Sequence, residues 1–215
     1  MKHLLKVMLI VGALFATTFI LGRAFGLLTV ENIRYWLVLA QNVAPVWVVG
    51  TVVLLLFLDL FVAVPTLTIT LLAGFFLGFP LGAATAFAGM TAAAFSGYAI
   101  SRVWGEKLIS VLIKNEGDRL DLVETFHKNG PAMIMLSRAA PIVPELTACM
   151  AGATRLRISQ YGLFFVVGTV PYVLIAAYAG SISSTSNPQP AIYAALFIYL
   201  ILWAGWYALR MRTKK

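Results

Sequence analysis

Long uncharged stretches divide the chain into segments. They cover residues 7–22, 35–58, 60–101 and 158–209, and a charged residue stands at each boundary. A helix needs about 20 apolar residues to cross the hydrocarbon core of a bilayer. The pattern predicts five membrane-spanning helices, at about residues 7–22, 43–62, 81–103, 158–181 and 191–209. The first resembles a signal peptide without a small-residue cleavage site, so we expect a retained anchor helix.

The segment at about residues 65–80 is too short and too broken to cross the bilayer. Pro65 and Pro80 bracket it, and Gly74 and Gly78 interrupt it. Two helical arms of about eight residues would each reach about 12 Å, less than half of a hydrocarbon core of about 30 Å. These features favour a re-entrant hairpin, which enters and leaves the membrane by the same face. The alternative is a single kinked span.

A second segment of the same kind lies at about residues 131–152. Its prolines are Pro131, Pro141 and Pro144, and it ends in Ala-Gly at Gly152, 78 residues after the Ala-Gly pair at Gly74. One full span separates the two segments, so the hairpins would enter from opposite faces. Opposed hairpins form an inverted repeat, as in many transporters. The polar residues 102–128 between them are expected to form an extramembrane loop or a short surface helix.

These elements predict an all-α polytopic membrane protein in three parts. An anchor helix and an interfacial segment would occupy residues 1–42, and a membrane domain with both hairpins would occupy residues 43–182. A C-terminal transmembrane helix and a basic tail would fill residues 183–215.

Composition supports lipid as the solvent of this chain. Of its 215 residues, 61% are hydrophobic and 11% are charged, and the mean hydropathy is +0.91. A soluble domain is about 45–50% apolar and about 25% charged. The formal net charge of +8 indicates positive-inside loops and anionic lipid rather than nucleic acid. Most basic residues fall on the side of the C-terminus, which is therefore expected to be cytoplasmic.

No familiar catalytic or metal-binding motif is present. The chain has no Walker A sequence, G-x-S-x-G, H-E-x-x-H or paired C-x-x-C, and neither histidine has a partner at metal-ligand spacing. The sequence therefore predicts no enzyme, no cofactor and no metal site. The single cysteine, Cys149, cannot form an internal disulfide.

Three charged residues stand inside otherwise apolar segments: Asp59, Arg138 and Glu145. A charge at the centre of the bilayer costs at least about 2.5–3.5 kcal/mol, so such residues are candidates for function. An arginine guanidinium binds phosphate oxygens with two parallel hydrogen bonds, which makes Arg138 a candidate phosphate ligand. The alternative is an internal ion pair with Asp59 or Glu145. Buried carboxyls can also bind and release protons near neutral pH.

The stretch from about residue 58 to 180 resembles the VTT domain, also called the SNARE-associated Golgi protein or DedA superfamily. An acidic residue precedes a proline-started hairpin at Asp59 and Pro65, and LLAGFFLGFPLG follows. A span rich in small residues leads to SGYAISRVWGE, then to SRAAPIVPELTACMAGATRLR, and a last span ends in YAGS. The resemblance implies two facing re-entrant hairpins and lipid-related transport, sometimes linked to the proton gradient.

The sequence departs from the DedA branch of that superfamily at two places. That branch often has a second acid in the first hairpin, where this chain has Thr66, Thr68 and Thr70. It also often has a second arginine six residues after the first, where this chain has Pro144. The Val-Pro-Glu form with Glu145 is closer to bacterial members outside the DedA branch.

The leading hypothesis is a transporter or scramblase that moves phospholipid or polyprenyl-phosphate headgroups, with the phosphate held by Arg138. The alternative is a proton-coupled carrier of a small ion or solute that uses Asp59 and Glu145. A third hypothesis is a non-transporting membrane scaffold. The expected partners are anionic or phosphate-bearing lipids and protons, and the expected location is the bacterial inner membrane. The sequence does not set the oligomeric state.

Overall fold

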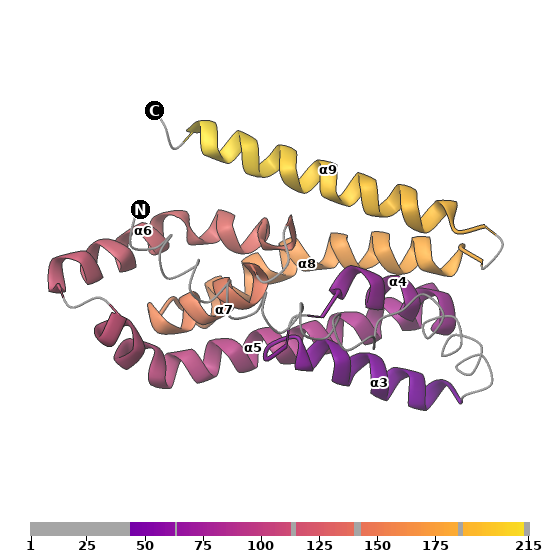
Figure 1. The fold of residues 1–215 in the computed structure, drawn as a ribbon, viewed down its shortest axis with the longest axis horizontal. Helices are drawn as coiled ribbons and strands as arrows, with labels where there is room; N and C mark the ends of the chain where they lie inside the picture. The colour runs from indigo at the N-terminus through magenta and orange to yellow at the C-terminus, as the bar shows by residue number, and fades with distance from the viewer. Residues whose placement is uncertain (1–43, 63, 113–114, 140–142, 185–186, 213–215) are drawn as a thin grey trace, which may run out of the picture. The chain divides into compact units, whose positions relative to one another are not determined.

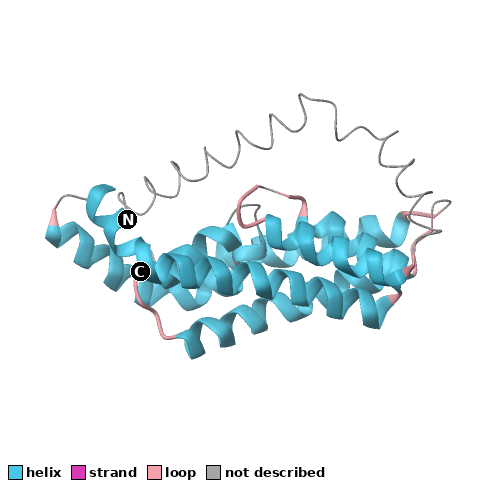
Figure 2. Cartoon of the chain, turned by 90° about the horizontal axis from the view of Figure 1, so that it is seen from below, coloured by secondary structure: helices cyan, strands magenta, loops and turns pink. Residues whose placement is uncertain are grey.

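The computed structural model describes residues 44–62, 64–112, 115–139, 143–184 and 187–212, and every regular element among them is helical (Figures 1 and 2). The helices are α3 Pro45–Leu58, α4 Thr66–Leu77, α5 Phe79–Leu112, α6 Glu116–Met135, η1 Ser137–Ala139, α7 Val143–Ala153, α8 Ile158–Ser181 and α9 Gln189–Arg212. The predicted all-α class is confirmed for the described residues. The predicted anchor helix and interfacial segment lie outside them.

The chain forms two compact units. The first, here called the α7 unit, comprises the described residues between 93 and 171 and between 199 and 212. The second, the α4 unit, comprises the described residues between 44 and 92 and between 172 and 198. Helices α5, α8 and α9 each contribute residues to both units, whereas each unit has its own short helix.

Among the described residues, two helices are long and apolar enough to cross a membrane. They are Phe79–Gly105 of α5 and Ile158–Ser181, which is the whole of α8. The bounds of α8 agree with the predicted span. The helix α3 has 14 residues, about 21 Å at 1.5 Å per residue, and is shorter than the predicted span because it begins at Pro45 and ends before Asp59. The total of five spans stays a prediction.

In the α4 unit, α4 is enclosed by helices whose backbones approach it closely. The chain reverses at Gly78, whose φ of +76° is a conformation that glycine adopts without strain, and this turn brings Gly82 of α5 against Ala73. Gly74 lies against the backbone of Ala177 in α8. Helix α3 also contacts α4. A side chain at Gly74 or Gly82 would separate these backbones.

In the α7 unit, α6, η1 and α7 pack on one another and form a second helical hairpin. The Asn115 side chain caps α6 by accepting a 2.9 Å hydrogen bond from Gly117 N. One face of α6 is buried at a spacing of four residues, at Leu122, Phe126, Gly130 and Ile134. In α7, Gly152 lies against the backbone of Tyr98 in α5.

The structure corrects the expected bounds of both hairpins. In the first, Gly74 lies inside a 12-residue helix and Gly78 alone forms the turn, so the second arm is the start of α5 and not a separate short helix. In the second, Pro131 does not break the chain, because it lies inside α6, which extends from the polar segment through to Met135. A proline removes one backbone hydrogen bond and its ring can be accommodated by a bend of the helix.

We predict that Gly74→Ala destabilises the protein. The added Cβ would meet the Ala177 carbonyl, and overpacking of this kind costs about 1–3 kcal/mol. The apparent melting temperature of the purified chain in detergent should fall. The matched control is Gly50→Ala in α3, where nothing lies within 4 Å of the added Cβ and alanine favours the helix. Equal melting temperatures for the two variants would contradict the packing described for α4.

Candidate functional site

Arg138 occupies the turn between two helices of the α7 unit. It is the central residue of η1, which follows α6 and precedes α7, and only 7% of its surface is exposed. Its guanidinium carbon lies 5.9 Å from the centroid of the Phe165 ring in α8. A cation over an aromatic face is attracted by the ring quadrupole, most strongly where water is excluded. The ring therefore forms one wall of the arginine site.

Glu145 is the buried acid of the same unit. It lies in the first turn of α7, where a carboxylate is favoured by the helix dipole, and 8% of its surface is exposed. Cys149 follows one helical turn later and is partly buried. Tyr161 of α8 is buried in the same unit. Arg138 and Glu145 are thus two buried charged residues of one unit.

A column of aromatic rings extends from Arg138 across the α7 unit. Phe165 contacts Tyr161 at 6.2 Å between ring centroids, and Tyr161 stacks on Tyr98 at 5.1 Å with an interplanar angle of 14°. Phe95 packs edge-on against both Tyr161 and Phe165. Such ring pairs stabilise their arrangement beyond the area that they bury. The column fixes α5 against α8 and so fixes the wall of the arginine site.

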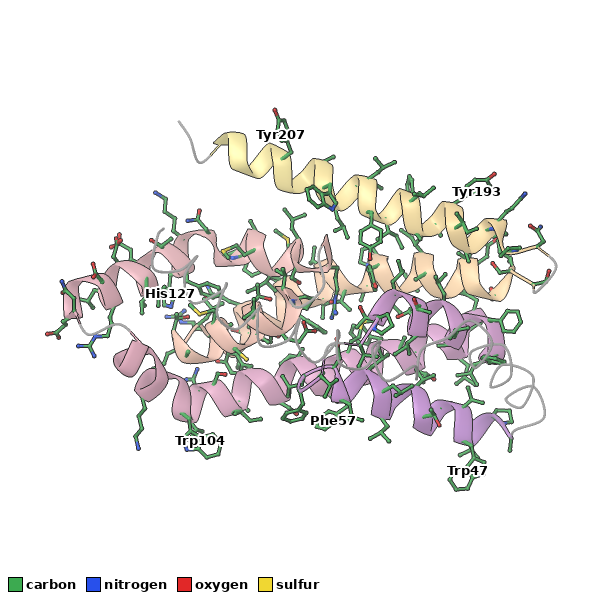
Figure 3. All side chains as sticks on the ribbon, viewed as in Figure 1. Trp47, Phe57, Trp104, His127, Tyr193 and Tyr207 are labelled. Atoms are coloured by element: carbon green, nitrogen blue, oxygen red, sulfur yellow. The ribbon has the colours of Figure 1, made fainter. Side chains whose placement is uncertain are left out.

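The C-terminal end of α7 is held on two sides. The Tyr98 hydroxyl donates a 2.6 Å hydrogen bond to the carbonyl of Leu156 and accepts one of 2.6 Å from Arg102 Nη1. On the side of α6, His127 Nε2 lies 2.9 Å from the carbonyl of Thr154, and Figure 3 shows its ring beside α7. The His127 contact involves the carbonyl of the residue that directly follows α7, where a helix leaves carbonyls without partners. The Tyr98 contact ties the turn after α7 to α5.

Asp59 belongs to the α4 unit and has a local structural role. It follows α3 directly, 6% of its surface is exposed, and its carboxylate accepts a 2.7 Å hydrogen bond from Val64 N. This bond closes the turn that leads from α3 into α4. The structure therefore assigns Asp59 to a different unit from Arg138 and Glu145.

The hairpin-shaping residues have distinct positions. Pro65 precedes α4 as its N-cap, and Pro80 and Pro144 each lie in the first turn of a helix, where the missing N–H costs nothing. Pro141 lies outside the described residues. Gly78 forms a turn, whereas Gly74 and Gly152 allow backbones to approach.

Two buried threonines of the short helices bond to their own helices. The hydroxyls of Thr70 and Thr147 donate to the carbonyls of Thr66 and Pro144 at 2.7 and 2.9 Å. This is the common behaviour of threonine in an apolar helix. Neither hydroxyl is therefore oriented towards a ligand.

The α7 unit combines a buried cation, a buried acid and a stack of polarisable rings. A guanidinium can hold an anionic oxygen, and a buried acid can carry a proton. No group of three potential metal-ligating side chains occurs among the described residues. The arrangement is therefore suited to binding a phosphate or carboxylate and to exchanging protons.

Sequence reasoning missed the aromatic column. The pattern of apolar and charged residues assigns no role to Tyr98, Tyr161 or Phe165. The signal available was the spacing of four residues in Tyr98–Arg102 and in Tyr161–Phe165, which places each pair on one helix face. Nothing in the sequence indicates that Tyr98 contacts Leu156, which is 58 residues away.

Comparison with known proteins identifies the family. The family model for the VTT domain matches residues 64–182, more than half of the chain, so the chain belongs to the VTT domain family. It is 33% identical over 86 residues to Protein DedA of Escherichia coli strain K12, and equally to Protein DedA of Escherichia coli O157:H7. Each match covers 39% of this chain and 39% of the relative. No solved structure matches at a significant level.

The VTT domain and the similarity to DedA confirm the family predicted from the sequence. Proteins of this superfamily are membrane proteins associated with transport or lipids, and the two long apolar helices agree with that class. The assignment to a branch outside DedA stays a prediction.

We predict that Tyr98→Phe loosens the end of α7. The change removes a hydroxyl that donates to the Leu156 carbonyl and accepts from Arg102, and a lost buried hydrogen bond costs about 1–3 kcal/mol. The melting temperature in detergent should fall. Tyr193→Phe is the control, because that side chain is 64% exposed. If Tyr98→Phe and Tyr193→Phe both have the melting temperature of the wild type, the hydrogen bonds of the Tyr98 hydroxyl do not stabilise the structure.

Proposed function

We propose that this protein is an integral membrane lipid transporter or scramblase. It moves phospholipid or polyprenyl-phosphate headgroups across the bilayer, and Arg138 holds the phosphate. It acts by transport and not by catalysis. The observation that carries the proposal is the burial of Arg138 beside the Phe165 ring in a helical hairpin of a VTT domain.

The chemistry of the cluster supports a phosphate ligand. A guanidinium is charged at physiological pH and forms two parallel hydrogen bonds with phosphate, each about twice as strong as a neutral one. In an apolar setting an unneutralised cation is costly, so a headgroup phosphate gains by replacing an internal counter-charge. When the phosphate replaces the internal counter-charge of Arg138, Glu145 can take up a proton and become neutral.

The short helices support a path through the membrane. The 12 residues of α4 and 11 residues of α7 extend about 18 and 17 Å, well under a hydrocarbon core of about 30 Å. In this proposal each short helix is part of a re-entrant hairpin, and the two hairpins enter from opposite faces. A short apolar path of this kind would lower the cost of moving a polar headgroup.

The topology in this proposal is that predicted from the sequence. Five spans place the side with most basic residues, including the C-terminus, in the cytoplasm of a bacterium. Residues 1–42 form the anchor part, 43–182 the membrane domain and 183–215 the last span with its basic tail.

We predict that Arg138→Ala abolishes most lipid redistribution in vesicles that contain the purified protein and fluorescent phospholipid. Loss of a hydrogen bond to a charged group costs about 1.5–3 kcal/mol, so the rate should fall at least about tenfold. Arg138→Lys keeps the positive charge but loses the planar guanidinium that forms two parallel hydrogen bonds with phosphate. Its rate of lipid redistribution should therefore be intermediate. Lys128→Gln, an exposed cation of α6, is the control at equal expression. Wild-type rates in Arg138→Ala would refute the role of Arg138.

A proton-coupled carrier of a small ion or solute is the second candidate. The observation that favours it is the burial of Glu145 in the same unit as Arg138 and Tyr161, since a buried acid can couple transport to protons. In this alternative Asp59 is the other coupling acid.

The proton gradient separates the two candidates. In vesicles, a passive scramblase keeps its rate when an uncoupler dissipates the gradient, whereas a coupled carrier stops. Glu145→Gln cannot release a proton, so it should abolish gradient-dependent uptake in a carrier. We expect lipid redistribution to continue after uncoupling; its arrest would favour the carrier.

A further inference from the structure

Two glycines on different helices contact the chain just before Arg138. Gly168 lies in α8, and a Cβ added there would stand 2.5 Å from the carbonyl oxygen of Met135, the last residue of α6. Gly205 lies in α9, and its added Cβ would stand 2.9 Å from a methyl group of Leu136, the next residue. All of these residues belong to the α7 unit. The turn that carries Arg138 thus approaches α8 and α9 more closely than side chains at positions 168 and 205 would allow.

The contact at Gly168 is in register with the contact of the arginine itself. Arg138 lies three residues after Met135. Its guanidinium carbon is 5.9 Å from the centroid of the Phe165 ring, which lies three residues before Gly168 in α8. The two segments therefore run in opposite directions and have two matched points of contact. Since three residues rise about 4.5 Å along a helix, the pair of contacts fixes the position of the turn along α8.

The turn between these two contacts is tied to the end of α6. The Ser137 hydroxyl donates a 2.8 Å hydrogen bond to the Ile134 carbonyl, and both residues are buried. Breaking a buried hydrogen bond would leave two polar groups without partners. A displacement of the Met135 backbone therefore displaces Arg138 as well.

The arginine site tolerates little movement of this turn. A cation is attracted to an aromatic face within about 6 Å of the ring centroid, and the guanidinium carbon of Arg138 is already 5.9 Å away. Non-bonded heavy atoms pack best at about 3.5–4.0 Å, so a Cβ at Gly168 would push the Met135 backbone away from α8 by about 1 Å. That movement is enough to end the contact between the guanidinium and the Phe165 ring.

We propose that Gly168 and Gly205 are positioning residues of the arginine site. Gly168 lets the backbone of the turn rest on α8, so that the guanidinium lies over the Phe165 ring. Gly205 leaves the space on α9 in which the Leu136 side chain is held. The consequence for lipid transport rests on the proposed function, whereas the position of the guanidinium does not.

The two glycine contacts differ in how a clash could be relieved. At Gly168 the added methyl group would meet backbone atoms, and no substitution of the Met135 side chain removes these. At Gly205 it would meet the end of a flexible side chain, which Leu136→Ala removes. The first contact is therefore rigid and the second can be rescued.

Fluorine NMR of the full chain in detergent tests the proposal. 4-Fluorophenylalanine at position 165 reports on the cation over the ring, and Arg138→Ala gives the resonance of the ring without that cation. Gly168→Ala should move the resonance most of the way to this position. The matched control in α8 is Gly162→Ala, whose added Cβ would meet the Phe95 ring at an ordinary contact distance of 3.4 Å. It should leave the resonance at its wild-type position.

A rescue experiment separates positioning from a general loss of stability. Gly205→Ala should move the resonance in the same direction as Gly168→Ala but by less, because a side chain can yield where a backbone cannot. Leu136→Ala in the Gly205→Ala protein should restore the wild-type resonance. Removing a second side chain from a packed site normally destabilises a protein further, so this recovery is not expected from stability alone.

Lipid redistribution in vesicles is measured on the same variants. Its rate should fall at least about tenfold in Gly168→Ala, as in Arg138→Ala, because the displaced guanidinium no longer meets the phosphate. A folded Gly168→Ala protein with the wild-type resonance would overturn the proposal. If that variant does not fold, a wild-type resonance in Gly205→Ala would overturn it. A moved resonance in Gly168→Ala together with wild-type lipid redistribution in Arg138→Ala would refute the proposed function and support the positioning role.

Discussion

Two short helices set the architecture, because a helix that ends inside a membrane protein cannot leave its end groups without hydrogen bonds. Lipid offers no partner for a free N–H or carbonyl, so irregular backbone at membrane depth must be covered by protein or water. Helix α4 is covered by α8 and α5, whose backbones approach it closely because Gly74 and Gly82 have no side chain. The end of α7 is covered by Tyr98 and His127, which reach the carbonyls of Leu156 and Thr154.

The two glycines paired by the internal repeat have the same kind of environment. Gly74 meets the backbone of α8, which follows the second hairpin, and Gly152 meets the backbone of α5, which follows the first. Each short helix is thus packed on the long helix that follows the other hairpin. The same kind of small-residue contact therefore occurs twice, and the inverted repeat stays a prediction. The turn that carries Arg138 lies between α6 and α7, which pack on each other.

The sequence predicted the elements that depend on composition along the chain. Charged Arg157 and the polar segment after Ser181 bound the α8 span, and the structure has the same limits. The hairpin bounds were less accurate, because Pro131 is compatible with the interior of α6 and Gly74 with the interior of α4. A proline or glycine marks a break only when its neighbours do not compensate for it.

The charged residues of the candidate site could be predicted from the sequence, but the aromatic residues beside them could not. Arg138 and Glu145 stand out as charges in apolar sequence, and the structure places both in one unit. The aromatic column joins α5 and α8, and such contacts between distant segments leave no local pattern. Asp59 was chosen by the same rule of buried charge, yet its carboxylate bonds to the nearby Val64 N, so local turn chemistry accounts for part of its burial.

The central claim is that Arg138 binds a lipid phosphate. A high-resolution map of the protein in lipid nanodiscs tests it most directly. The account predicts headgroup density with a phosphate oxygen about 2.7–2.9 Å from a guanidinium nitrogen of Arg138, beside the ring of Phe165. A map in which carboxylates of the protein occupy the whole guanidinium, with only acyl-chain density nearby, would contradict it.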